Sequence, residues 1–120
     1  MEKKLVLLVD DERDFVDTLA ERLDIRGIKA KVAYDGESAL DMVQNETYEA
    51  MVLDLRMPGI DGIEVLRETS RLLPGLPVII LTGHGNEKDR EKCFNLGAFA
   101  YMNKPVDIKE LAGIIKKSGE

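Results

Sequence analysis

The sequence has one cysteine, no tryptophan and one histidine among its 120 residues. The single cysteine, Cys93, excludes an internal disulfide and fits a reducing compartment, so we expect a cytoplasmic protein. The sole histidine, His84, stands between two glycines in an expected loop. A lone loop histidine is usually part of the polar surface, so we assign it neither catalysis nor metal binding.

Basic residues are outnumbered by acidic ones, and long apolar runs are scarce. With 17 Lys and Arg against 23 Asp and Glu, the formal net charge is −6. This balance argues against nucleic-acid binding by the chain and favours a protein or cation partner, while also serving solubility. The apolar run Leu5–Val9 is too short for a signal peptide or a membrane span, so we expect no membrane contact.

Short apolar runs alternate with segments whose apolar residues recur at helical spacing. This alternation predicts one α/β domain over residues 1–120, a parallel sheet with helices on both faces. Five units predict a three-layer (βα)5 flavodoxin-like fold with strand order 2-1-3-4-5. A Rossmann dinucleotide fold is disfavoured, because no G-x-G-x-x-G follows the first strand. The predicted strands are Leu5–Val9, Ile28–Tyr34, Ala50–Leu53, Val78–Leu81 and Ala98–Asn103.

The helical segment Asn86–Leu96 differs from the others because most of its residues are charged. It offers three side chains to a core, those of Cys93, Phe94 and Leu96. We therefore expect it to be the most weakly held helix and the easiest to shift.

Polar residues follow four of the five predicted strands. They are Asp10-Asp11, Asp54, Thr82 and Lys104-Pro105. The carboxyl ends of parallel strands share one edge of the sheet, where ligands bind in open α/β folds. The sequence therefore predicts three carboxylates, one hydroxyl and one ammonium group in a single site.

This combination of groups suits phosphate chemistry. Three carboxylates close together need a cation, and Mg²⁺ (or Mn²⁺) prefers oxygen ligands of this kind. Lys104 would bind phosphate as a point charge, and a cis bond to Pro105 would fix the turn that directs it. Thr82 adds a hydroxyl, and Asp54 on the middle strand is the best candidate nucleophile for an aspartyl phosphate.

The pattern resembles the receiver domain of two-component response regulators over essentially all 120 residues. The stretch 81–85 is most similar to receivers of the nitrogen-regulation type. The resemblance rests on Asp10-Asp11, Asp54, Met57-Pro58-Gly59, Asp61-Gly62, Thr82-Gly83, Gly97-Ala98, Tyr101 and Lys104-Pro105.

The resemblance implies a role for each site residue. Asp54 would accept a phosphoryl group from a phosphohistidine of a sensor histidine kinase, in a Mg²⁺-dependent reaction. Asp11, Asp54 and the backbone carbonyl of Arg56 would ligate the metal, with Asp10 acting through water. The phosphoryl oxygens would be held by Thr82 and Lys104.

The resemblance also implies a switch. The Thr82 hydroxyl would move to the phosphate, and the ring of Tyr101 would turn inward behind it. The surface formed by the segment Asn86–Leu96, the fifth strand and the last helix would then control a downstream protein or a covalently linked output domain. A dimer that forms only on phosphorylation is also compatible with the resemblance. Arg56 and His84 would flank the path of the attacking water.

Three other interpretations remain open. A phosphatase of the haloacid-dehalogenase type also uses an aspartyl nucleophile and Mg²⁺, but it needs a second aspartate where this chain has Arg56. A flavodoxin-like electron carrier shares the fold, but its phosphate would be repelled by Asp10-Asp11 and Glu12. The third interpretation is a receiver that docks on its partner without being phosphorylated. Only a phosphorylation assay would distinguish it from a receiver that is switched by phosphorylation. For the receiver we expect self-phosphorylation and self-dephosphorylation, and no other enzymatic activity.

Overall fold

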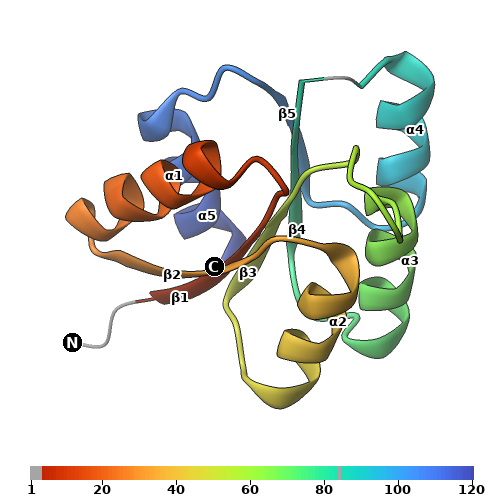
Figure 1. The fold of residues 1–120 in the computed structure, drawn as a ribbon, viewed down its shortest axis with the longest axis horizontal. Helices are drawn as coiled ribbons and strands as arrows, with labels where there is room; N and C mark the ends of the chain where they lie inside the picture. The colour runs from red at the N-terminus through yellow and green to blue at the C-terminus, as the bar shows by residue number, and fades with distance from the viewer. Residues whose placement is uncertain (1–3, 84) are drawn as a thin grey trace.

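The structure, a computed structural model, describes residues 4–83 and 85–120, and within them five strands alternate with five helices (Figure 1). All the strands pair in parallel, in the order β2-β1-β3-β4-β5, which confirms the predicted fold class. The strands are β1 (Lys4–Val9), β2 (Ile28–Ala33), β3 (Ala50–Leu53), β4 (Val78–Thr82) and β5 (Ala100–Asn103). The helices are α1 (Arg13–Ile25), α2 (Gly36–Asn45), α3 (Gly62–Leu72), α4 (Glu87–Asn95) and α5 (Ile108–Ser118).

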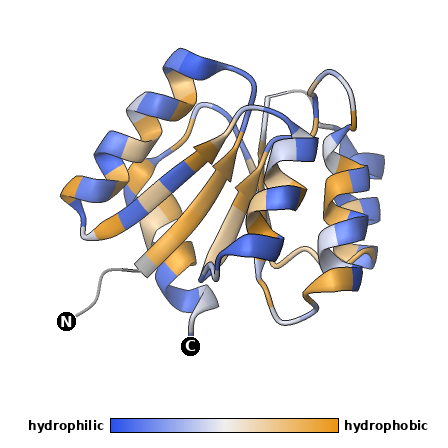
Figure 2. Cartoon of the chain, turned by 60° about the horizontal axis from the view of Figure 1, so that its bottom comes forward, coloured by the Kyte–Doolittle hydropathy of each residue, from blue (hydrophilic) through white to orange (hydrophobic). Residues whose placement is uncertain are grey.

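The central strands send their side chains alternately into two cores, one on each face of the sheet. In β1, Leu7 and Val9 belong to the core covered by α2, α3 and α4, while Val6 and Leu8 belong to the core covered by α1 and α5 (Figure 1). Strands covered on both faces are apolar throughout, as expected for a parallel sheet. Figure 2 shows the hydrophobic colours on these strands and on the helix faces turned toward them.

Strand β2 forms one edge of the sheet and keeps the alternation expected of an edge. It pairs with β1, and its Lys29 and Lys31 are exposed while Ile28 is buried. Lys31 reaches Glu46 with its Nζ 2.5 Å from Oε1. Lysines on an edge strand oppose pairing with another chain, so this edge is protected from aggregation.

The helices begin and end at residues suited to those positions. Asp107, which the sequence predicts as a helix cap, accepts hydrogen bonds from the backbone N–H groups of Lys109 and Glu110 at 2.9 and 3.1 Å. After α1 the chain turns at Gly27 with φ of +83°, a conformation that favours glycine. No helix in the described ranges combines the length and apolar character needed to cross a bilayer.

Helix α4 is attached to the sheet by one fully buried side chain, Cys93. Leu96, just beyond the helix, is partly buried against the same core. The prediction that Phe94 joins the core is wrong, because its side chain is 39% exposed and the Arg90 guanidinium lies 5.1 Å from its ring centre. Residues three apart share a helix face, so Cys93 and Leu96 leave Phe94 turned away. The core anchor is thus smaller than predicted.

Candidate functional site

Two buried aspartates lie side by side at the carboxyl ends of β1 and β3. The strands pair with Val9 opposite Leu53, so the residues that follow, Asp10 and Asp54, are neighbours. The backbone N–H of Asp54 donates to the Val9 carbonyl at 2.9 Å, which extends the pairing into the site. Each aspartate is only 3% exposed. Two carboxylates this deeply buried need a positive partner.

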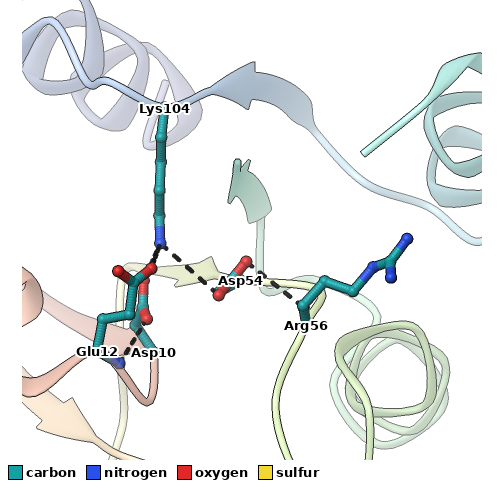
Figure 3. A network of polar contacts seen from close by, with 5 residues as sticks. All are labelled: Asp10, Glu12, Asp54, Arg56 and Lys104. Carbon is teal, nitrogen blue, oxygen red and sulfur yellow. Dashed lines mark hydrogen bonds and ion pairs between the residues drawn. The ribbon is translucent and has the colours of Figure 1, made fainter. Parts of the chain in front are cut away.

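Lys104 supplies that positive charge from the end of β5. Its Nζ lies 2.9 Å from Asp10 Oδ2, 2.6 Å from Glu12 Oε1 and 3.7 Å from Asp54 Oδ2 (Figure 3). The same Nζ is 4.4 Å from the ring centre of Phe15, whose face favours a cation. The predicted meeting of Asp10, Asp54 and Lys104 is therefore present. The Lys104-Pro105 bond is cis, which is the form expected to fix the turn at the lysine.

The third carboxylate at the site is that of Glu12. Asp10 Oδ1 accepts the backbone N–H of Glu12 at 2.9 Å, and this turn brings the Glu12 side chain to Lys104. Glu12 precedes α1 at its N-cap position but makes no capping hydrogen bond with its side chain. Asp11, expected here from the sequence, is exposed in the loop, so its role as a direct metal ligand stays a prediction.

The carboxylates fit a divalent cation. Asp10, Glu12 and Asp54 each offer an oxygen, and these oxygens all lie within 4.8 Å of one another. Three carboxylates, two of them buried and that of Glu12 exposed, leave with the Lys104 ammonium a formal charge of −2. Mg²⁺ or Mn²⁺ would neutralise this charge with the hard oxygen ligands that such ions prefer. The donor set is therefore suitable for the predicted metal.

Burial and hydrogen bonding shift the pKa values of Asp10 and Lys104 in opposite directions. Burial raises the pKa of the Asp10 carboxyl, and this outweighs the hydrogen bonds from the Glu12 backbone and from Lys104. Burial alone would lower the pKa of Lys104, but its hydrogen bonds to Glu12 and Asp10 and the nearby carboxylates raise it overall. Lys104 therefore stays charged at neutral pH, whereas the ionised form of Asp10 lowers the stability of the folded protein.

Neutralising Asp10 should therefore stabilise the metal-free protein. A carboxyl whose pKa is raised on folding loses stability as pH rises through that pKa, so Asp10→Asn should have a higher Tm than wild type at pH 7 in EDTA. The advantage should shrink as the pH falls through the raised pKa and wild-type Asp10 becomes protonated. Asp35→Asn is the control, because a hydrogen bond from Ser38 lowers the Asp35 pKa and no gain is expected there. An Asp10→Asn Tm below wild type at pH 7 would contradict the prediction.

Thr82 and Tyr101, the predicted switch pair, lie close together on the neighbouring strands β4 and β5. Thr82 is fully buried, and its carbonyl accepts the backbone N–H of Lys104 at 3.0 Å, which links the hydroxyl-bearing strand end to the lysine. The Tyr101 hydroxyl is buried and has no hydrogen-bond partner among the described residues. Burial is the main reason that the Tyr101 pKa is raised.

The remaining predicted site residues lie at the margin. The Arg56 backbone N–H donates to Asp54 Oδ1 at 3.5 Å, and its side chain extends away from the carboxylates (Figure 3). Its role as a carbonyl ligand stays a prediction. Pro105 is exposed beside Lys104. His84, expected to flank the site, lies outside the described residues.

Known proteins share both this sequence pattern and this fold. The transcriptional regulatory protein CpxR of Escherichia coli (strain K12) is 40% identical over 114 residues, which are 92% of this chain and 47% of CpxR. The receiver domain of NtrX from Brucella abortus superposes with a TM-score of 0.88 at 30% identity, covering 95% of this chain and 97% of that one. A Burkholderia pseudomallei response regulator superposes with a TM-score of 0.89 at 25% identity, covering 98% and 69% of the two chains.

These likenesses establish the family and leave the sub-family open. The chain spans about half the length of CpxR. The nitrogen-regulation sub-family stays a prediction, since relatives with different names match this chain at similar coverage. The family described as "Response regulator receiver domain" matches residues 6–116. The chain therefore belongs to the response regulator receiver domain family.

Proposed function

We propose that this receiver domain is a phosphorylation-activated switch in which Asp54 accepts a phosphoryl group from a phosphohistidine of a sensor histidine kinase. One observation carries the proposal: the Asp54 carboxylate is buried at a strand end, beside the carboxylates of Asp10 and Glu12 and 3.7 Å from Lys104 Nζ. The Burkholderia relative supports it, because that structure contains a phosphorylated aspartic acid and a calcium ion.

The transfer is a nucleophilic displacement at phosphorus. An Asp54 oxygen forms the new bond to phosphorus, the bond from phosphorus to the kinase histidine nitrogen breaks, and the imidazole leaves. Lys104, already charged and directed into the site, offsets the negative charge of the phosphoryl oxygens. Asp10 and Glu12 would hold a divalent cation beside Asp54, with Asp11 and the Arg56 carbonyl as the further ligands implied by the family; when bound, the cation supplies additional positive charge for the same oxygens.

The signal would leave through the surface next to Thr82 and Tyr101. Aspartyl phosphate adds charge and acceptor oxygens near the Thr82 hydroxyl, and α4, with its small core anchor, is free to repack. The surface of α4, β5 and α5 would then act on a downstream protein or a covalently linked output domain. A cytoplasmic location and a dimer dependent on phosphorylation belong to the same proposal.

The test is labelling with a small phosphodonor. With acetyl phosphate and Mg²⁺, we expect intact-mass spectrometry to find the mass of one added phosphoryl group, and EDTA in excess over Mg²⁺ should abolish it. No adduct at any Mg²⁺ or Mn²⁺ concentration would contradict the proposal and favour a receiver that docks unphosphorylated. Multiple turnovers of a phosphate monoester would favour the phosphatase instead.

A further inference from the structure

Gly85 occupies the space beside the buried Tyr101 hydroxyl. A Cβ atom built on Gly85 would overlap Tyr101 Oη and would lie 2.8 Å from Tyr101 Cζ and 2.9 Å from Thr82 Cγ2. Real Cβ atoms essentially never lie within 3.0 Å of a neighbour, so no side chain fits while Tyr101 stays inward. The space that Gly85 leaves open is thus bounded by both members of the predicted switch pair.

The backbone itself does not require glycine at this position. The φ angle of Gly85 lies outside the left-handed region, which in the described structure is occupied by Gly27, Gly59 and Gly97. Alanine could therefore adopt the Gly85 backbone. What opposes it is chiefly the Tyr101 side chain, with Thr82 Cγ2 as a second close neighbour at 2.9 Å. The glycine is needed for the space that it leaves, not for its conformational freedom.

We propose that Gly85 is a positioning residue for the output switch: the missing side chain admits the inward Tyr101, and a single methyl group there would hold Tyr101 outward. The Tyr101 hydroxyl makes no compensating hydrogen bond in its inward position among the described residues. The Tyr101 hydroxyl occupies the space in which a Gly85 Cβ would stand, so one methyl group is enough to remove the fit of the inward ring. The link to signalling rests on the proposed function, whereas the steric relation does not.

Fluorine NMR on protein labelled with 3-fluorotyrosine tests the steric relation. The chain has three tyrosines, Tyr34, Tyr48 and Tyr101, and the Tyr101 signal is assigned by its loss in Tyr101→Phe. In Gly85→Ala we expect the Tyr101 signal to move to a solvent-exposed position. The matched control is Gly83→Ala in the same loop, whose Cβ would lie 3.7 Å from Lys104 Cδ, an ordinary contact. A Tyr101 signal unchanged in Gly85→Ala would overturn the proposal.

A thermal double-mutant cycle covers the case in which Gly85→Ala folds poorly. The loss in Tm caused by Gly85→Ala should be large in the wild-type background. It should be much smaller in Tyr101→Ala, which removes the overlapping Tyr101 atoms and leaves only the 2.9 Å contact with Thr82 Cγ2. If Gly85→Ala lowers Tm equally in both backgrounds, or prevents folding in both, Tyr101 is not what the glycine accommodates and the proposal fails.

A third experiment uses phosphorylation and therefore depends on the proposed function. Gly85→Ala treated with acetyl phosphate and Mg²⁺ should gain the phosphoryl mass while its Tyr101 signal stays at the exposed position. A Tyr101 signal that moves to the buried position on labelling would overturn the role of Gly85. If the wild type takes no label, the proposed function fails, and the NMR comparison of unlabelled proteins still decides the role of Gly85.

Discussion

Replacing Asp54 with asparagine should abolish labelling of the domain by acetyl phosphate in Mg²⁺. The amide preserves the shape of the side chain but removes the nucleophilic oxygen and one of the three carboxylates that face Lys104. We expect no phosphoryl adduct by intact-mass spectrometry under conditions that label wild type to completion. Circular dichroism should show the same fold, because the substitution adds no volume to the buried site.

The matched control is the same substitution at Asp61. Its side chain is exposed and accepts the backbone N–H of Glu64 at 3.0 Å as the N-cap of α3, a role that asparagine fills equally well. Asp61→Asn should therefore label like wild type. Persistent labelling of Asp54→Asn would place the acceptor on another residue, and peptide mapping of the adduct would identify it.

Replacing Gly62 with alanine should cause the largest loss of stability among the conservative changes considered. A Cβ at Gly62 would lie 2.5 Å from Leu55 Cα and 3.0 Å from the carbonyl carbon of Asp54, and it would overlap the Asp54 carbonyl oxygen. These are backbone atoms, which cannot move aside as a flexible side chain can. We expect a loss of about 3 kcal/mol and a fall in Tm of about 10 °C.

Gly113→Ala is the control for this change, since both glycines are helical. A Cβ at Gly113 meets nothing within 4 Å, so alanine should stabilise the domain by about 0.5 kcal/mol through its better helix propensity. Chemical denaturation of the two variants measures both values. Equal effects of the two substitutions would show that the contact of α3 with the Asp54 backbone carries little energy. Gly62→Ala should also slow labelling, because the displaced backbone is that of Asp54.

The meeting of Asp10, Asp54 and Lys104 could be predicted from the sequence because it follows from the parallel arrangement of the strands. Parallel strands bring their carboxyl ends to one edge, and the register that places Val9 opposite Leu53 places the two aspartates together. Hydrophobic patterning carries this information directly. The same reasoning placed Asp11 in the site and missed Glu12, because both residues lie beyond the strand, where the hydrophobic pattern no longer fixes the direction of a side chain.

Glu12 reaches the site through a local turn. Acidic residues are common near the start of a helix, so the presence of Glu12 there does not reveal this turn. The signal that could have found it is the hydrogen bond from its backbone to Asp10, a turn that aspartate commonly makes two residues ahead. Phe94 was misplaced for a related reason: the short, charged α4 gives too few apolar positions to fix its rotation. Gly85 is harder still, because a glycine says nothing about which side chain fills the space beside it.

The Lys104 ion pairs join parts of the chain that are 92 positions apart, from Glu12 to the residue after β5. No fragment lacking either end can assemble the acceptor site, since the ammonium and the carboxylates would then never meet. A ligand that binds only the assembled site stabilises the domain against global unfolding. Under the proposed function, a chain that has not finished folding would therefore accept no phosphoryl group.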